Sequence, residues 1–393
     1  MEQSISHKGN SRDDSSTEHF FRRLKRTVKV KKCSKLLHQK ICFKRILKMA
    51  EKKTPPQKTP PQKNVKSIQF DLFREFHDNN KKRISNTIEI WERIPKYFPA
   101  RTLKKLYPEK GHPDPFEWDY IDNNYKYTVI IRPALIKENG VYTAFFPSAT
   151  EELIEESLKK ILSSNEYGIH DPKKSETWVK FSLSIIFREL KENGCTRSRS
   201  EIKRSIEIMN KCNISFLKNG KEVWSGAILQ DLITISRKDY LENTDSHHIA
   251  RLPLFISNAI NKLDYRQFNY SRLMSCNSSL SRWIYKRLIH RYKQANFINS
   301  YHFMYSDLKN SGLLQQSIEG DNRKKTLSAL NELVKKDVLT RYESQNKLKN
   351  RKIIDVKYTL YPSSNFISEQ KAANSRTKEI TIKTKKLLSV DKS

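Results

Sequence analysis

The stretch from Ser279 to Lys293, SLSRWIYKRLIHRYK, combines the apolar spacing of a buried helix with six side chains that carry or can accept a positive charge. At about 100° per residue, Ile284 and Leu288 fall on one arc of a helix, and Arg282 and Lys286 fall on the opposite arc. The segment has no Asp or Glu. No pair within the helix therefore offsets the repulsion between like charges one turn apart. If the segment is considered alone, a charged helix face exposed to water explains it. If the rest of the protein is also strongly basic, binding of a polyanion is the better explanation.

The composition favours the second explanation. The formal net charge is +33 and the isoelectric point is near 9.8. Such a charge disfavours a compact chain unless a polyanion binds, and nucleic acid ranks before an anionic membrane surface as the partner. No apolar run reaches the length of a membrane span or forms a signal-peptide core. We expect an intracellular protein.

The cysteines indicate reduced thiols. Five of them are dispersed without a CxxC motif, as in proteins of a reducing compartment. Cys33, His38 and Cys42 form a cluster that lacks a fourth zinc ligand. We expect neither a metal nor another cofactor.

No enzyme signature appears in the sequence. Asn219-Gly220-Lys221 is a hairpin turn rather than a phosphate-binding loop. A rolling-circle nickase needs two metal-binding histidines separated by one residue, whereas His247 and His248 are adjacent and are expected in an exposed loop. Without a nucleophile triad or a pair of carboxylates, the sequence predicts a protein that is not an enzyme.

Changes in composition divide the chain into five parts. Residues 1–63 are a basic tail that ends in the polyproline-like doublet TPPQKTPPQK, and we expect this tail to be disordered. A connector follows at 64–148, with a strand over Tyr125–Ile136 and the acids Asp114, Glu117 and Asp119 in turns. Two winged-helix domains at 149–245 and 246–365 and a disordered basic C-terminal tail at 366–393 complete the prediction. The expected fold class is α+β and mainly helical.

The two winged-helix domains are inferred from a repeated order of elements. The first has helices over 150–162, 178–194 and 198–212, with a capping box of Ser198 and Glu201, then a hairpin at Asn219-Gly220 and a strand over 227–236. The second has helices over 279–293, 301–312 and 321–337, the last capped by Asp321 or Asn322. Strands over 339–344 and 353–362 then flank a basic loop, QNKLKNRK.

In helix-turn-helix folds the third helix enters the major groove, and its outward side chains contact bases and phosphates. Ile202, Ile206 and Met209 form the expected inward stripe of the first third helix, and Leu327, Leu330 and Val334 that of the second. The outward polar residues, with those of the 279–293 helix and the basic loop, are the predicted DNA-binding set. They are Arg197, Arg199, Lys203, Arg204, Lys211, Arg282, Lys286, Arg287, Arg323, Lys324, Lys325, Ser328, Asn331, Lys347, Lys349 and Arg351.

The stretches Ser278–Ala295, Ser306–Gly312 and Arg323–Glu343 together resemble the C-terminal domain of plasmid-encoded RepA replication initiators. The shared core is matched here by Ser278, Arg282, Trp283, Tyr285, Lys286, Arg287, Leu288 and His290. The resemblance implies a bacterial, cytoplasmic, DNA-associated protein that binds repeated sites in a plasmid origin, acts in copy control and recruits host proteins such as the helicase. Homodimerisation is left open.

Two other functions have to be weighed against replication initiation. A winged-helix transcription regulator would bind duplex DNA in the same way without an origin. An RNA-binding protein would display stacking aromatic side chains on a sheet, whereas the aromatic residues here have mainly helix-core spacing.

Overall fold

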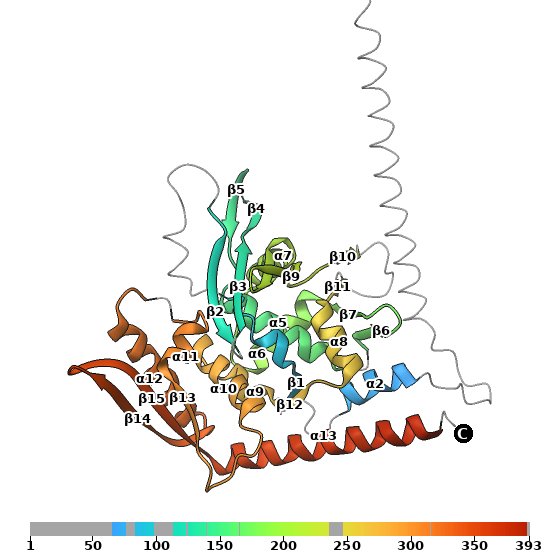
Figure 1. The fold of residues 1–393 in the computed structure, drawn as a ribbon. Helices are drawn as coiled ribbons and strands as arrows, with labels where there is room; N and C mark the ends of the chain where they lie inside the picture. Colours follow the sequence, from blue (N-terminus) through green and yellow to red (C-terminus); the bar gives the residue numbers. More distant parts are fainter. Residues whose placement is uncertain are drawn as a thin grey trace, which may run out of the picture. The chain divides into compact units, whose positions relative to one another are not determined.

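The computed structural model of the chain consists of antiparallel sheets with helices packed on them (Figure 1). The structure describes residues 65–75, 83–97, 113–122, 125–138, 140–164, 166–235, 247–314 and 316–390. The predicted basic tail and linker at 1–63 lie outside these residues. The described residues after Lys63 belong to one compact unit.

Two four-stranded sheets are formed by the middle of the chain. The first has the order β2-β3-β8-β9 and the second β10-β11-β7-β6. Their strands are β2 (Phe116–Asp122), β3 (Tyr125–Arg132), β6 (Gly168–Asp171), β7 (Glu176–Phe181), β8 (Asn213–Lys218), β9 (Lys221–Gly226), β10 (Leu232–Ile235) and β11 (His247–Arg251). Because β3 pairs with β8, strands of the predicted connector are built into the same sheet as the Asn219-Gly220 hairpin.

The predicted strand over 125–136 is confirmed as β3 and the start of β4 (Ala134–Glu138), which pairs with β5 (Val141–Phe145). The turn predicted at Glu117 and Asp119 is wrong, because both residues lie in β2. The exposed loop predicted for His247 and His248 is also wrong. They lie in β11, where His248 pairs with Phe181, and the flanking apolar residues Ile249 and Ala250 are buried.

Three helices, α5 (Ala149–Leu162), α6 (Leu183–Glu192) and α7 (Arg199–Lys211), match the predicted helices of the first domain except at one end. The capping box of Ser198 and Glu201 is confirmed at the start of α7. The helix predicted from 178 is wrong over its first residues, which form β7. Trp178, Val179 and Phe181 are buried strand residues, and the side chain of Ser182 then caps α6.

The C-terminal part has the order α10 (Ser279–Arg291), β13 (Tyr301–Met304), α11 (Tyr305–Asn310), α12 (Glu319–Lys335), β14 (Leu339–Lys349) and β15 (Lys352–Pro362). The strands form a sheet in the order β13-β15-β14. The predicted basic loop is wrong: β14 continues to Lys349, and only Asn350 and Arg351 make the turn, with φ of 50° and 61°. A two-residue turn with positive φ matches the twist of a hairpin. Ile318, not Asp321 or Asn322, is the N-cap of α12.

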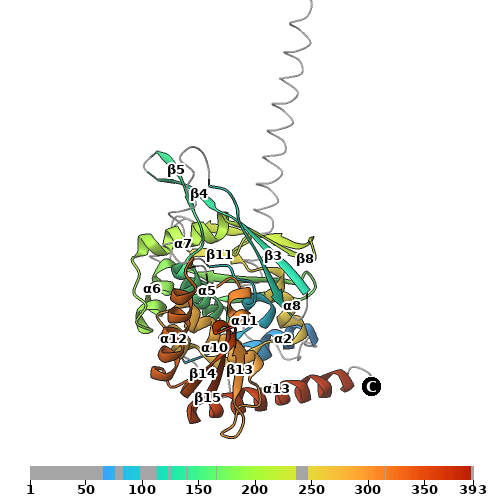
Figure 2. The same cartoon turned by 60° about the vertical axis from the view of Figure 1, so that its left-hand side comes forward.

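The predicted disordered tail at 366–393 is wrong up to Val390, because this segment is the helix α13 (Ser364–Val390). Phe366, Ile367 and Ile380 are buried, and Arg376 donates a hydrogen bond of 2.7 Å to the carbonyl oxygen of Leu72 in α2 (Val65–Arg74). Both views show α13 running beside α2 (Figures 1 and 2). Apolar residues at helical spacing thus hold this basic segment on the protein.

The remaining elements are β1 (Ile84–Thr87), α3 (Glu89–Glu92), α8 (Leu254–Lys262), β12 (Arg266–Asn269) and α9 (Tyr270–Met274). Strand β1 pairs with β12 and contacts α5, and α3 contacts α10. Helices and antiparallel sheets both contribute large parts of the structure, as the α+β class predicts, but the strands exceed what a mainly helical protein would contain.

Candidate nucleic-acid interface

Helix α12 presents one continuous polar line to solvent. Lys324, Ser328, Asn331 and Lys335 are spaced by three or four residues, so they share one face, and all four are exposed. The opposite face is buried, with Thr326, Ala329, Leu330 and Leu333 in the core. An exposed helix with two ammonium groups and two hydrogen-bonding side chains in line can contact phosphates and base edges.

The buried face of α12 is rotated about the helix axis relative to the predicted stripe of Leu327, Leu330 and Val334. Leu330 is buried as predicted, but Leu327 and Val334 are only half-buried. Because the rotation also moves the flanks, Arg323 and Lys325 are half-buried rather than open. Burial lowers the pKa of the Lys325 ammonium.

A groove lies between α12 and the hairpin of β14 and β15. Arg323, Lys324 and Leu327 line it from the helix, and Asn346, Ile353 and Tyr358 are among the lining residues of the hairpin. On the same helix, Asn331 accepts a hydrogen bond of 2.9 Å from the Tyr342 hydroxyl of β14. The hairpin therefore fixes the orientation of α12 along its length.

The predicted basic residues of the hairpin, Lys347, Lys349 and Arg351, are exposed. Lys347 lies in β14 opposite Asp355, while Lys349 flanks the two-residue turn that contains Arg351. Two paired strands place these cations at defined positions along the hairpin, which a loop without pairing would not do. The structure thus places the hairpin that carries these cations beside α12.

The predicted residues of α7 form a weaker surface. Ile202, Ile206 and Met209 are buried as expected, and Arg199 and Lys203 are exposed. The remaining cations of this set have partners. Arg197 donates to the Thr150 hydroxyl at 3.3 Å, Arg204 lies 3.6 Å from Glu138 of β4, and Lys211 pairs with Glu207. Strand β4 of the β4–β5 hairpin packs against α7, so less of the surface of α7 is open to a ligand.

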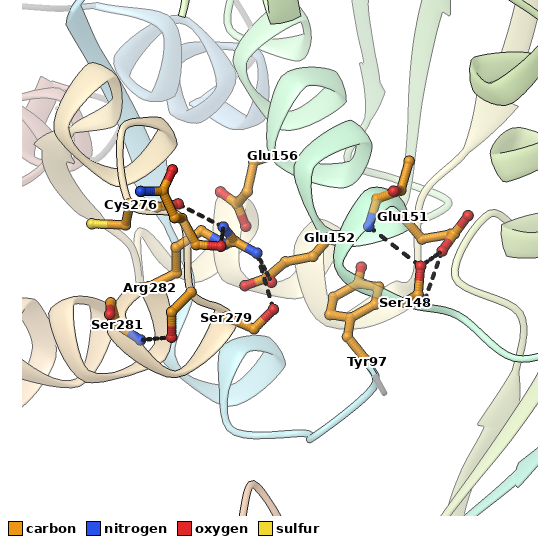
Figure 3. Close-up of polar contacts among 12 residues, drawn as sticks. Tyr97, Ser148, Glu151, Glu152, Glu156, Cys276, Ser279, Ser281 and Arg282 are labelled. Atoms are coloured by element: carbon orange, nitrogen blue, oxygen red, sulfur yellow. Dashed lines mark hydrogen bonds and ion pairs between the residues drawn. The ribbon is translucent and has the colours of Figure 1, made fainter. Parts of the chain in front are cut away.

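The largest correction to the predicted DNA-binding set concerns α10. Arg282 and Lys286, expected to face DNA, have only 1% and 5% of their surface exposed, and His290 is also buried. The Arg282 guanidinium donates to a Glu152 carboxylate oxygen at 2.7 Å and to the Cys276 carbonyl oxygen at 2.7 Å (Figure 3). The charged arc of α10 therefore faces carboxylates inside the protein.

Eight charged residues form what we call the buried charge cluster. Its carboxylates are Glu92, Glu152, Glu155 and Glu156, and its cations are Lys96, Lys159, Arg282 and Lys286. The Lys286 ammonium lies 2.5 Å from Glu156 and 2.6 Å from Glu92, and Lys159 lies 2.6 Å from Glu156. Four negative charges thus meet four positive charges, which is the condition for burying them.

The direction of the pKa shifts agrees with this pairing. Burial alone would raise the pKa of Glu92, but Lys159 and Lys286 lower it well below its usual value. Burial alone would lower the pKa of Lys159, but Glu156 and Glu92 raise it well above its usual value. The histidine on this arc behaves differently: burial lowers the pKa of His290 to about 4, and its Nε2 lies 3.3 Å from the Thr87 hydroxyl. His290 is neutral at pH 7.

Sequence reasoning missed the carboxylates of the cluster, although a signal was present for the three that lie in α5. α5 carries Glu151, Glu152, Glu155 and Glu156 within two turns, while α10 has no acid at all. A helix rich in acids and a helix that carries only basic charges can pair with each other. The prediction considered pairs only within α10 and so did not compare it with α5.

Arg287 is the predicted α10 residue that stays accessible. It is half-buried, its guanidinium stacks 5.4 Å from the Trp283 ring centre, and its Nε donates to the Tyr301 hydroxyl at 3.1 Å. It borders a cleft of about 530 Å³ with Tyr120, Arg93 and Asn310 among the other lining residues. None of the four residues in the exposed line of α12 is among the lining residues of this cleft.

Within the residues that the structure describes, no group of three metal-ligating side chains comes together, and Cys195, Cys212 and Cys276 are free thiols. Cys33, His38 and Cys42 lie outside those residues. No helix in the described part is long and apolar enough to cross a membrane.

No protein-family model and no curated protein matches the chain. Among solved structures, it is similar to domains 2 and 3 of RctB. One crystal structure gives a TM-score of 0.42 at 12% identity over 65% of this chain and 94% of that one, and another gives 0.41 at 12% over 70% and 100%. It is also similar to the Pi initiator protein in complex with iteron DNA, with a TM-score of 0.32 at 14% identity over 55% and 90% of the two chains. At these TM-scores the likeness carries no argument about function, so the interface has to be judged on its own contacts.

Proposed function

We propose that the chain is a sequence-specific duplex DNA-binding protein that initiates plasmid replication, and that α12 enters the major groove with the β14–β15 hairpin beside it. The observation that carries the proposal is the exposed line of Lys324, Ser328, Asn331 and Lys335 on α12. It joins the features that reading DNA requires: cations for phosphates, hydrogen-bonding side chains for base edges, and a rigid helix.

The order of elements supports a winged helix at this site. α10, β13, α11 and α12 are followed by a long hairpin, and the strands close a three-stranded sheet. In the middle of the chain, α5, β6, β7, α6, α7, β8 and β9 follow a similar order, which supports the tandem arrangement. There the hairpin of β8 and β9 is extended by β2 and β3, a departure from a free wing.

Duplex DNA fits this interface better than single-stranded RNA. RNA readers display aromatic side chains on a sheet for base stacking. The sheet beside α12 instead keeps Phe303 and Tyr358 in the core, with 2% and 1% of their surface exposed. The exposed chemistry at α12 is ammonium, hydroxyl and amide, which suits groove and backbone contacts.

Initiation at repeated plasmid sites, copy control and recruitment of the host helicase rest on the resemblance to RepA-type initiators. Several residues of the shared motif, including Arg282 and Lys286, are buried and hold the fold together. The motif therefore supports a related architecture. In the proposal, the main DNA contacts come from α12 and the hairpin, and the exposed Arg199 and Lys203 of α7 make a second contact. A transcription regulator with the same DNA chemistry is the second candidate. As part of the same proposal, the protein acts without enzymatic chemistry, in association with DNA in the bacterial cytoplasm.

A charge placed in the exposed line tests the DNA-binding part. Ser328→Glu puts a carboxylate between Lys324 and Lys335, and we expect loss of duplex binding without a change in melting temperature, because Ser328 is exposed. Ser368→Glu on the exposed face of α13 is the matched control and should bind normally. Equal binding by both variants would exclude α12 as the contact.

A replication assay separates the two candidate functions. A plasmid that carries the gene and its flanking repeats should be maintained with the wild-type protein and lost with Ser328→Glu, while the soluble protein persists. If the repeats bind the protein but no flanking sequence supports replication, the regulator is the correct assignment.

A further inference from the structure

The buried charge cluster joins three distant stretches of the chain. Glu92 and Lys96 come from α3 and the residues after it, Glu152, Glu155, Glu156 and Lys159 from α5, and Arg282 and Lys286 from α10. The Lys286 ammonium alone bridges residues 130 and 194 positions away. Figure 3 shows the Arg282 end of this junction, where α10 meets α5 through Glu152.

The two predicted third helices, α7 and α12, are attached to different sides of this junction. On one side, α7 packs on α5, and Arg197 just before α7 donates to the Thr150 hydroxyl of α5. On the other side, the backbone N–H of Asn277 donates to Glu332 of α12 at 2.6 Å, and the Ser281 hydroxyl of α10 donates to the same carboxylate at 2.5 Å. The path from α7 to α12 therefore runs through α5, the buried charge cluster and α10.

Ion pairs at such a junction fix position more strictly than apolar contacts do. An apolar face can slide by a fraction of a helical turn and keep most of its buried area. A buried ammonium that shifts by the same amount loses its carboxylate and stays unsolvated, which is strongly unfavourable. In some proteins a buried polar contact serves mainly to select one register.

We propose that the buried charge cluster sets the spacing of DNA recognition: it fixes α7 and α12 relative to each other, so the chain accepts its two contacts at one separation along DNA. Lys286 is then a positioning residue that determines specificity without touching DNA. This inference rests on the proposed duplex binding by α12 and α7, and it adds that ion pairs inside the protein fix the length of the spacer between the two contacts.

A charge-balanced variant tests the inference. Lys286→Met with Glu156→Gln removes one cation and one carboxylate and leaves the remaining charges of the cluster equal in number. The matched control is Lys383→Met with Glu75→Gln, which removes a pair at 2.7 Å that joins α13 to α2, with side chains 47% and 46% exposed. Each protein selects duplexes from a random-sequence library, and the spacer lengths between the two selected motifs are counted.

The wild type and the control should each select two motifs at one spacer length. Changing that spacer by one base pair should weaken binding about tenfold or more, which is the order of one lost base contact. The cluster variant should select the same two motifs at several spacer lengths, with a smaller loss for each change. A cluster variant that keeps the single spacer would overturn the inference while leaving duplex binding intact. A wild type that selects one undivided motif would also overturn it. A wild type that selects no motif would instead refute the proposed function.

A measurement on the wild-type cluster covers the case in which the double variant does not fold. Spin-labelled amino acids are incorporated at Lys211 at the end of α7 and at Ser317 just before α12, both exposed. The inference predicts one narrow distance distribution with and without duplex DNA. Two populations, or a broad distribution, would show that the two helices are not fixed.

Discussion

Removing one partner of the Arg282–Glu152 pair should be far more costly than removing both. The pair is separated by 2.7 Å, and its side chains are 1% and 7% exposed. Glu152→Gln leaves a buried guanidinium that keeps its bonds to Cys276 and Ser279 but loses its counter-charge. Arg282→Met leaves a buried carboxylate. Each single change should lower the free energy of unfolding by about 3–5 kcal/mol, as is usual when one half of a buried pair is lost.

The double variant, Arg282→Met with Glu152→Gln, buries no unpaired charge. Its free energy of unfolding should lie within about 1–2 kcal/mol of the wild type, because the lost attraction is offset by the lost desolvation penalty. Urea unfolding of the four proteins at pH 7 gives the coupling energy from a double-mutant cycle. Single variants that each cost less than about 1 kcal/mol, or costs that simply add in the double variant, would refute the reasoning.

The same argument predicts how the stability of Arg282→Met changes with pH. In the wild type, burial alone would raise the pKa of Glu152, but Arg282 lowers it below its usual value. Without Arg282, only Lys286 and the hydrogen bond from Ser279 still oppose burial, and we expect the pKa of Glu152 to rise above that of the unfolded chain. The stability of this variant should then be fully present below the unfolded pKa and decrease as the pH rises through the folded pKa. The deficit relative to the wild type should therefore shrink on acidification.

Three further predictions concern the core, the reader helix and the basic tail. Leu288→Ala removes a fully buried side chain of α10 and should cost about 2–5 kcal/mol in urea unfolding, with DNA binding lost only as the protein melts; normal stability would show that Leu288 lies outside the core. Arg323→Ala should leave the melting temperature nearly unchanged and relax specificity at one base pair by about 1–3 kcal/mol in single-mismatch binding assays. Wild-type discrimination at every position would remove Arg323 from the base contacts. Deleting residues 1–63 should weaken binding to all duplexes similarly and leave the selected motif unchanged, because this segment adds charge without a folded reading surface; a changed motif would make it a reader.

Local signals predicted the helices well where a cap or a turn residue marked their ends. The capping box at Ser198 and the Asn219-Gly220 turn are both found as expected. Errors arose where strand and helix patterns coincide, as at Trp178–Phe181 and Tyr301–Met304. In each case a short strand runs directly into a helix, and a single apolar pattern covers both.

The placement of the charged residues could not be obtained from one segment at a time. Arg282 and Lys286 have a helical spacing that fits a DNA-binding face as well as a buried one. Their burial depends on glutamates 130 residues away, which only the tertiary structure brings into contact. The exposed line of α12 was predicted in part, since Lys324, Ser328 and Asn331 were expected outside, and Lys335 was not included.

A salt titration of two matched double variants tests the central claim that α12 binds duplex DNA. Lys324→Ala with Lys335→Ala removes two exposed cations of α12, and Lys173→Ala with Lys174→Ala removes two exposed cations between β6 and β7. Both lower the net charge equally. If α12 contacts DNA, the first variant should bind more weakly, and its log–log salt slope should be smaller by about 1.8, or about 0.9 per lost phosphate contact. The second variant should keep the wild-type slope. Equal slopes for the two variants would contradict the account, because the effect would then come from net charge and not from α12.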